Sequence, residues 1–314
     1  MDDLEVRQLR YFVAVAEELH FGRAAERLGV AQPSLSRALG ELERQLGVKL
    51  VDRTTRHVAL TSAGTVLLED ARTALDAVSA AGRRVRNAGL TRPRLRLALK
   101  ADHDSGLLPQ ILASYEREDS SLPFELVLGA RGEQAPALRD GRADVALILG
   151  PFDTRRLDHE ALLSEPRLAA VAAGDPLADK LSLRLADFDS RVLPDGSLAA
   201  EDRSSRPFNA VPLGPVEPAP GLAPAQRPRD LTQILNLVEL GSIVSFLPLS
   251  ITRRYLRPGI VYLPVQDLVP VTLAVVWPAE ARSRAAAAFV RAAITVAAAA
   301  QQDVLTTLRL KDVS

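Results

Sequence analysis

The sequence predicts an α/β protein of 314 residues, with a helical module at the N-terminus, a long connecting helix and a larger α/β region. Three observations predict this class. Apolar residues recur at helical spacing up to residue 46, a spacing of four and three continues over residues 62–88, and strands alternate with helices from residue 94. With 47% hydrophobic and 25% charged residues, the chain is long enough for two or three domains with cores of their own.

The N-terminal module is predicted to hold three helices. A second helix over residues 22–28 should end at Gly29, because glycine adopts the left-handed conformation of helix C-termini without steric cost. After a turn at residues 30–32, Pro33 suits the first turn of the third helix. The apolar stripes expected to be buried are Leu9, Phe12, Val13, Ala16 and Leu19 on the first helix, and Leu35, Leu39, Leu42 and Leu46 on the third.

The outward face of the third helix is predicted to enter the major groove of DNA. It is small near its N-terminus and carries Arg37 and Arg44 further on, as expected of a recognition helix. The alternating segment 49–60 predicts a two-stranded wing, whose Arg53 and Arg56 would reach phosphates or a narrow minor groove. The alternative is a purely structural three-helix domain with a solvated charged face.

The run AAERLGVAQPSLSRALGELERQLGVKLVDRTTRHVALTSAG resembles the winged helix-turn-helix of LysR-type transcriptional regulators, almost position for position. The resemblance implies sequence-specific binding of double-stranded DNA by a domain over residues 1–61. It implies that Gln32, Pro33, Ser36 and Arg37 face the major groove and that Arg56 approaches the minor groove. The full set expected to bind DNA is Arg23, Gln32, Pro33, Ser34, Ser36, Arg37, Arg53, Thr54 and Arg56.

Composition restricts the partners. The 39 basic and 39 acidic residues balance, so DNA affinity requires a local positive patch, and residues 32–61 hold five basic against three acidic side chains. The absence of cysteine excludes disulfides, thiol redox sensing and thiolate metal sites. The N-terminus is acidic where a signal peptide is basic, and no apolar run is long enough to span a membrane. We therefore expect a cytoplasmic protein that does not contact membranes.

Residues 62–88 are predicted to form one long linker helix capped by Ser62. Its seam is rich in alanine and valine, so another helix can approach closely. The alternative is packing against its own domain. In the LysR family the equivalent helix pairs with its copy, so the resemblance implies a homodimer or homotetramer on an interrupted inverted repeat. The seam consists of Leu67, Ala71, Ala74, Val78, Ala81 and Val85.

Past a hinge at residues 87–93, a β-α-β-α-β pattern predicts a parallel sheet. Its strands are expected at 94–100, 124–128 and 143–149, with helices at 107–117 and 133–140. Further strands are expected at 167–172, 243–247, 260–263 and 271–276, and further helices at 230–240, 249–255 and 283–300.

This region resembles the LysR effector domain, which has the two-lobed architecture of periplasmic binding proteins. The strand pattern and the segments RDGRADVALI and VELGSIVSFLP carry the resemblance. Two features depart from the family: Ser242 stands where glycine is common, and residues 211–228 are rich in proline. The resemblance implies an effector-binding regulatory domain over 93–300, with lobe I at 93–162 and 268–300, lobe II at 163–267, and a C-terminal tail at 301–314.

A small-molecule effector is expected between the lobes, where the parallel strands end. Lys100 and Arg131 would suit a carboxylate, whereas the acidic residues around His103 would favour an amine or a cation. For each charged residue the alternative is a solvated loop. A metal site at residues 102–104 would lack a second ligand cluster, so no metal is expected. The expected effector-binding residues are Lys100, Asp102, His103, Ser105, Arg131, Gly132, Asp195 and Ser197.

Catalysis finds little support. The sequence contains no GxSxG, Walker A or GxGxxG motif, so we expect neither an enzyme nor a cofactor. The sequence therefore predicts a one-component transcription regulator controlled by a small molecule. The alternatives are a small-molecule binding protein without DNA-directed regulation and an enzyme fused to a helix-turn-helix.

Overall fold

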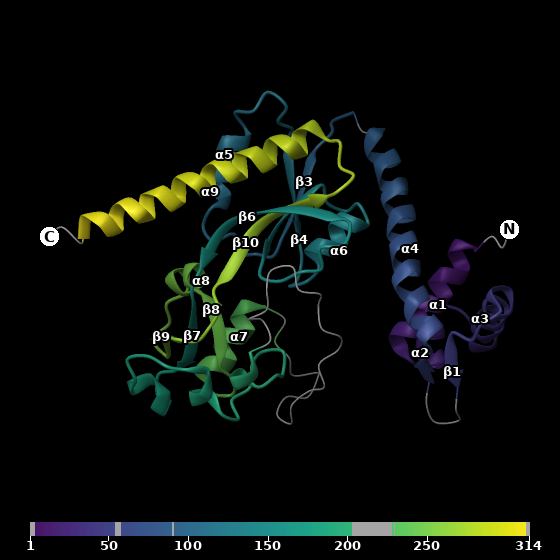
Figure 1. Ribbon diagram of the computed structural model, residues 1–314, viewed down its shortest axis with the longest axis horizontal. Helices are drawn as coiled ribbons and strands as arrows, with labels where there is room; N and C mark the ends of the chain where they lie inside the picture. Colours follow the sequence, from purple (N-terminus) through teal and green to yellow (C-terminus); the bar gives the residue numbers. More distant parts are fainter. Residues whose placement is uncertain (1–3, 54–57, 90, 203–227, 229, 312–314) are drawn as a thin grey trace. The chain divides into compact units, whose positions relative to one another are not determined.

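The computed structural model describes residues 4–53, 58–89, 91–202, 228 and 230–311 (Figure 1). It divides into two compact units, Met1–Leu90 and Thr91–Ser314. Among the helices described, none is both long and apolar enough to cross a membrane.

The N-terminal unit is a three-helix module with a two-stranded wing and a long fourth helix (Figure 1). Leu35, Leu39 and Leu42 are buried against the first two helices, as the apolar spacing predicts. Leu19 was expected on the buried stripe, but this prediction is wrong: it ends α1 with φ 46° and is 44% exposed. The elements are α1 (Val6–Glu18), α2 (Phe21–Leu28), α3 (Gln32–Leu46), β1 (Val51–Arg53), β2 (Val58–Leu60) and α4 (Ser62–Ala88).

The ends of these helices follow ordinary capping chemistry. Gly29 ends α2 with φ 65°, as expected. The expected cap at Ser62 is one residue late, because the side chain of Thr61 accepts the hydrogen bond from the N–H of Gly64 at 3.0 Å.

Lobe I of the larger unit is built on a five-stranded sheet of order β4-β3-β5-β10-β6. The first three of these strands are parallel, as predicted, while β10 is antiparallel to both neighbours. Alternate residues face two cores, one under α5 and α9 and the other under α6 (Figure 1). The elements are β3 (Leu95–Leu99), α5 (Leu108–Tyr115), β4 (Phe124–Leu128), α6 (Gln134–Arg139), β5 (Val145–Leu149), β6 (Leu157–Glu165), β10 (Val271–Pro278) and α9 (Arg284–Lys311).

The sequence did not predict β6. Its pairing with β10 shifts register between Leu273 and Ala274, and this irregularity breaks the simple alternation by which a strand is recognised. Because β6 continues to Glu165, the lobe I sheet extends past residue 162, where lobe I was expected to end.

Lobe II is built on an antiparallel sheet of order β8-β7-β9. Helices α7 and α8 pack on one face, and the other face is covered by short 3-10 turns. Most of the proline-rich stretch 211–228 lies outside the residues described. The elements are β7 (Arg167–Ala172), α7 (Leu231–Glu239), β8 (Ser245–Pro248), α8 (Leu249–Arg254) and β9 (Ile260–Pro264).

Helix α9 was expected to end near residue 300, but it continues to Lys311. It forms a single helix that runs on past the sheet (Figure 1). Residues 301–311, which were expected to belong to a separate tail, therefore continue the backbone of α9.

Candidate functional site

One face of α3 is buried and the other is open to solvent. Gln32, Pro33, Ser34 and Arg37 are exposed, and Ser36 is half-buried. Gln32 was expected in the preceding turn but begins the helix. Among the described residues, Arg37 makes only a long bond within its own helix, from Nε to the carbonyl oxygen of Pro33 at 3.4 Å. Most of the guanidinium is therefore available to an outside partner.

Arg23 is held more firmly. Its Nη2 donates to the carbonyl oxygen of Glu18 at 2.6 Å, and its Nε lies 3.4 Å from the Glu18 carboxylate. The side chain therefore joins α2 to the end of α1. Because it is still 61% exposed, a phosphate could reach it only in competition with Glu18.

A buried carboxylate anchors the wing. Glu43 on α3 is 4% exposed and accepts from the N–H groups of Leu50 and Val51 at 3.0 and 3.2 Å. Lys49 adds an ion pair at 2.9 Å. Burial raises the pKa of Glu43, but these three donors outweigh it and bring the pKa below its ordinary value.

The residues predicted at the tip of the wing lie outside the described part of the chain. They are Thr54, Arg56 and the side chain of Arg53, whose backbone ends β1. Their predicted contacts with DNA stay predictions.

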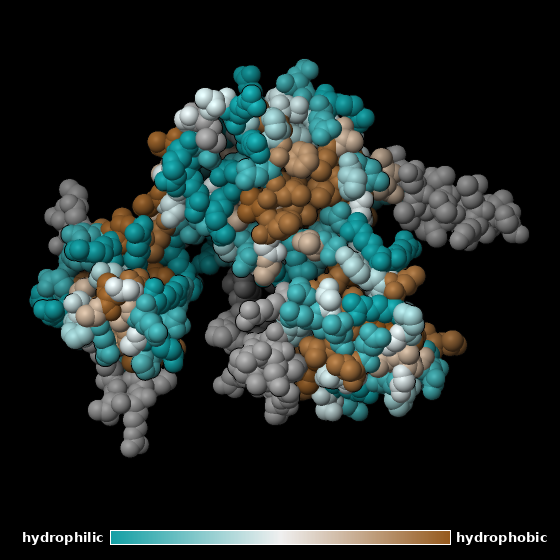
Figure 2. Space-filling view, turned by 180° about the vertical axis from the view of Figure 1, so that it is seen from behind, coloured by the Kyte–Doolittle hydropathy of each residue, from teal (hydrophilic) through white to brown (hydrophobic). Residues whose placement is uncertain are grey.

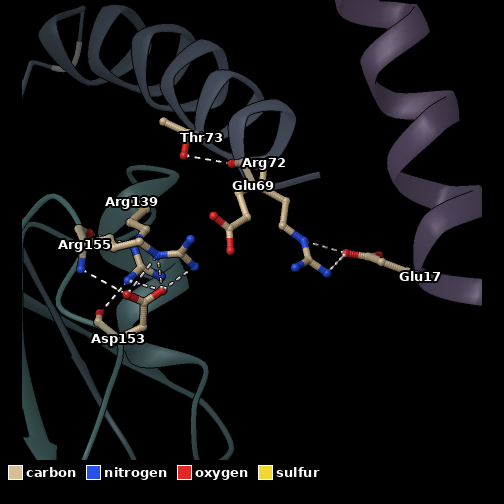
Figure 3. A network of polar contacts seen from close by, with 7 residues as sticks. All are labelled: Glu17, Glu69, Arg72, Thr73, Arg139, Asp153 and Arg155. Atoms are coloured by element: carbon tan, nitrogen blue, oxygen red, sulfur yellow. Dashed lines mark hydrogen bonds and ion pairs between the residues drawn. The ribbon is translucent and has the colours of Figure 1, made fainter. Parts of the chain in front are cut away.

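Helix α4 is tied to α1 by a cluster of ion pairs on Glu17. Arg72 places its Nη2 2.8 Å from Glu17 Oε1 (Figure 3), and Arg27 on α2 lies 2.9 Å from Oε2. In the larger unit, Figure 3 also shows Asp153, which binds Arg139 of α6 at 3.0 Å and Arg155 at 2.7 Å. These clusters hold neighbouring elements together and involve none of the predicted binding residues.

A cavity of about 350 Å³ lies between lobe I and lobe II, past the carboxyl ends of β3 and β4. Five of the residues expected to bind an effector line it, and three do not. Residues that local sequence patterns did not flag complete the wall, among them two acids, one arginine and several apolar side chains. The expected residues in the wall are Lys100, His103, Arg131, Asp195 and Ser197.

Two cations from lobe I face this cavity. Neither Lys100 nor Arg131 makes a side-chain hydrogen bond or ion pair with any other residue in the described part of the chain. Desolvation lowers the pKa of Lys100, although Asp102 and Asp230 oppose it. Arg131 is reached by solvent through the cavity, yet surrounding protein and nearby Arg167 lower the pKa of its guanidinium. An arginine stays charged in any such site.

His103 lies beside these cations and is neutral. Burial lowers its pKa to about 3, and the charges of Lys100 and Arg131 add to the effect. At neutral pH the imidazole therefore offers the cavity one donor and one acceptor without a charge.

The charged residues of lobe II have partners of their own. Arg167 and Asp202 form a buried ion pair at 2.8 Å, with side chains 4% and 1% exposed. Asp195 accepts from the N–H and the hydroxyl of Ser197 at 2.9 and 2.7 Å. Asp230 caps α7 by accepting from the N–H of Gln233 at 2.8 Å. Each of the last two carboxylates uses one oxygen in these bonds.

The loop between β3 and α5 turns its acidic residues away from the cavity. Asp104 forms an ion pair with Arg254 on α8, and Asp102 accepts from the hydroxyl of Tyr255 at 2.6 Å. Ser105 donates to the carboxylate of Glu165. Asp102 and Ser105 have φ values of 68° and 49°, which strain residues other than glycine. Asp102 and Asp104 thus bind lobe II, so the amine or cation site expected around His103 is not formed.

Gly132 also lies outside the cavity wall, in the turn that follows Arg131, with φ 90°. Its lack of a side chain allows this turn. Among the described residues, no group of three or more His, Cys, Asp or Glu side chains is arranged to hold a metal ion.

The sequence missed Asp230, Arg167 and Asp202. Asp230 carries a local signal, because an aspartate immediately before an apolar helical run is a common N-cap. Arg167 and Asp202 are 35 positions apart, and no local pattern marks such a pair.

Comparison with known proteins agrees with both parts of this structure. Residues 6–65 match the model of the bacterial regulatory helix-turn-helix protein, lysR family, and residues 88–298 match the LysR substrate binding domain. The Hca operon transcriptional activator HcaR of Escherichia coli is 30% identical over 282 residues, covering 87% of this chain and 92% of that protein. The regulator IlvR of Caulobacter vibrioides is 33% identical over 287 residues, with the same coverage.

Among solved structures, the crystal structure of CbnR, a LysR family transcriptional regulator, superposes with a TM-score of 0.51 at 26% identity. The match covers 94% of this chain and 99% of CbnR. With both family models matched in order, this chain belongs to the LysR family of DNA-binding transcriptional regulators and carries that family's effector-binding domain.

Proposed function

We propose that this regulator is controlled by a small molecule with an anionic group, bound in the cavity between the lobes. The observation that carries the proposal is a pair of cations on one wall of that cavity, Lys100 and Arg131, whose side chains have no partner among the described residues. A carboxylate is the group that best matches an arginine fork beside a lysine. His103 and Ser197 add uncharged polar atoms that orient the ligand.

On DNA, the outward face of α3 reads bases in the major groove. Gln32, Pro33, Ser34, Ser36 and Arg37 carry this role in our proposal, supported by the exposure of that face and the burial of the opposite one. Arg23 adds a phosphate contact. The wing residues Arg53, Thr54 and Arg56 add contacts to the backbone and the minor groove.

The regulator acts as a homodimer, or as a homotetramer of two dimers, on an interrupted inverted repeat. The second half of the apolar seam of α4 supports this, because Val78 and Val85 are 44% and 75% exposed. In the first half, Ala71 is buried in the core of the N-terminal unit, so that part of the seam packs on its own domain. Strand β4 lies at the edge of the lobe I sheet and exposes Leu126 by 42% and Leu128 by 63%. Hydrophobic residues also gather on the surface of the larger unit (Figure 2). Such surfaces mark contacts with other proteins, here further copies of the chain.

Effector binding changes the arrangement of the subunits, and with it the spacing or bend of the bound DNA. The physical requirement is that the effector bind one arrangement better than the other. The protein does this without catalysis and in the cytoplasm, where a regulator meets its promoter. Several relatives are hydrogen peroxide-inducible genes activators, but a chain without cysteine has no thiol with which to sense peroxide.

The experiment is a footprint of the purified full-length protein on DNA upstream of its own gene and on a pool of genomic fragments, at two salt concentrations. We expect two protected half-sites in register, with protection that weakens as salt rises. Absence of specific protection on both the upstream DNA and the pool would contradict the DNA-directed role.

A further inference from the structure

The charges of the cavity are segregated by lobe. Lobe I contributes the cations Lys100 and Arg131, and lobe II contributes the carboxylates of Asp195 and Asp230. No ion pair joins either of these cations to either carboxylate in the part of the chain that the structure describes. The two sets nevertheless act on each other, since Asp230 opposes the lowering of the pKa of Lys100, and Asp195 that of Arg131. Opposite charges therefore face one another across open space.

The remaining charges of the wall cancel. Arg167 and Asp202 neutralise each other in their buried ion pair, and His103 is neutral. The described wall thus holds three cations and three carboxylates. A ligand with two negative charges would place one of them against the carboxylates of lobe II, which repel it. An amine would leave the cations of lobe I without a negatively charged partner. A ligand with one group of each sign satisfies both sides.

Apolar side chains make up most of the rest of the wall. Leu193, Ile234, Phe246 and Ile251 of lobe II line it, together with Leu149 and Val271 of lobe I. Burying a hydrocarbon group here contributes roughly 25 cal/mol per Å² of apolar surface removed from water. The ligand should therefore carry an apolar body as well as its charged groups.

We propose that the effector is a small zwitterion, with a carboxylate on Lys100 and Arg131 and an ammonium group on Asp195 and Asp230, and with an apolar side chain. This rests on the proposed function, in that the cavity is the effector site. A zwitterion bound in this way touches both lobes at once. It therefore favours the arrangement in which the lobes are close, whereas a simple carboxylate would occupy lobe I alone.

The test compares ligands that share one hydrocarbon body. Isothermal titration calorimetry of the full-length protein is run with the L-amino acids valine, leucine, isoleucine, methionine and phenylalanine. Each is matched with its deaminated acid and its decarboxylated amine. We expect at least one amino acid to bind, with its acid and its amine about 10- to 100-fold weaker, the loss typical of removing one charged hydrogen-bonding group.

Two variants remove the negative charge and keep the structural hydrogen bonds. In Asp195→Asn the amide oxygen still accepts from Ser197, and in Asp230→Asn asparagine remains a good helix cap. Both substitutions should lower the affinity for the amino acid by about 10-fold or more and leave the affinity for the deaminated acid unchanged. The matched control is Asp158→Asn, because Asp158 is an exposed acid on β6 outside the cavity. It should change neither of these two affinities.

The proposal is overturned if a deaminated acid binds as tightly as its amino acid, or if none of the amino acids binds. The footprint separates this failure from that of the proposed function. Protected half-sites together with tight binding of an acid alone would leave an anion-controlled regulator and remove only the zwitterion. Binding of an amino acid without protection of DNA would leave the zwitterion site standing and contradict the DNA-directed role.

Discussion

Arg254 at the end of α8 lies 3.0 Å from the carboxylate of Asp104, with its Nη1 on Asp104 Oδ1, and so links lobe II to the loop after β3 in lobe I. The two residues are 150 positions apart. Glu165 reinforces the link, because it is 6% exposed and accepts from Ser250 N–H at 2.7 Å as well as from Ser105. The lobes are thus joined by charge and hydrogen bonding beside the effector cavity.

Arg254→Gln should lower the free energy of unfolding of the larger unit by about 1–3 kcal/mol, because it leaves the Asp104 carboxylate without its partner in a buried position. The measurement is urea unfolding followed by the fluorescence of Trp277, the single tryptophan, which lies on β10. Arg253→Gln is the control, since Arg253 is exposed and its side chain makes no hydrogen bond or ion pair with another described residue. Equal effects of the two substitutions would show that the ion pair does not stabilise the domain.

Glu43→Ala should loosen the wing. Two buried N–H groups, of Leu50 and Val51, lose their acceptor, at a cost of about 1–3 kcal/mol each. Hydrogen exchange followed by mass spectrometry should show the amides of residues 49–53 exchanging at least 10-fold faster. Glu41→Ala removes only an exposed pair with Arg44 and should leave these amides protected. Unchanged exchange in Glu43→Ala would contradict the anchoring role.

His103 makes stability depend on pH in the larger unit. Its pKa falls from 6.5 to about 3 on folding, so between these values the unfolded chain binds a proton that the folded chain does not. The free energy of unfolding should therefore decrease as pH falls below 6.5, by at most about 1.4 kcal/mol per pH unit. Above pH 6.5 this contribution is constant. Trp277 fluorescence at pH 7 and pH 5 measures it, and His103→Gln should reduce the difference; an equal difference in both proteins would refute the assignment.

Arg37→Ala should weaken binding to the specific site by about 1–3 kcal/mol if Arg37 reads a base, while binding to random DNA changes much less. Electrophoretic mobility shifts on the footprinted site and on scrambled DNA give the two affinities. Arg10→Ala removes an exposed arginine from α1 and is the matched control. A uniform loss on both DNAs would instead make Arg37 a phosphate contact.

Ala81→Glu should break the dimer through α4, because it places a charge in the exposed apolar seam beside Val78 and Val85. Light scattering coupled to size exclusion measures the mass in solution. Thr73→Glu adds the same charge to an exposed position off the seam and should leave the assembly intact. A dimer that survives Ala81→Glu would argue that other surfaces hold the copies together.

Much of the fold could be predicted because its signals are local. The apolar run of Val145–Leu149 and the glycine after α2 each identify an element within a few residues. Strand β6 was not predicted because its bulge interrupts the alternation of apolar and polar residues. The end of α9 was predicted too early, although nothing in its composition stops a helix near residue 300.

Residues of the candidate site could be predicted where their position depends only on the end of a strand. Lys100 and Arg131 follow the parallel strands β3 and β4, and they meet at one edge of the sheet. Asp102 and Asp104 follow β3 equally closely, but their orientation depends on Arg254 and Tyr255 in the other lobe. A pattern in the sequence cannot reveal such distant partners.

The loop after β3 performs two tasks on one short stretch of backbone. Lys100 and His103 line the cavity, while Asp102 and Asp104 bind the opposite lobe directly and Ser105 does so through Glu165. A change of ligand preference made here, in evolution or in the laboratory, would therefore also alter how tightly the domain closes. A biosensor built on this chain would be retuned more safely on the lobe II wall, at Ile234 or Phe246, than within this loop.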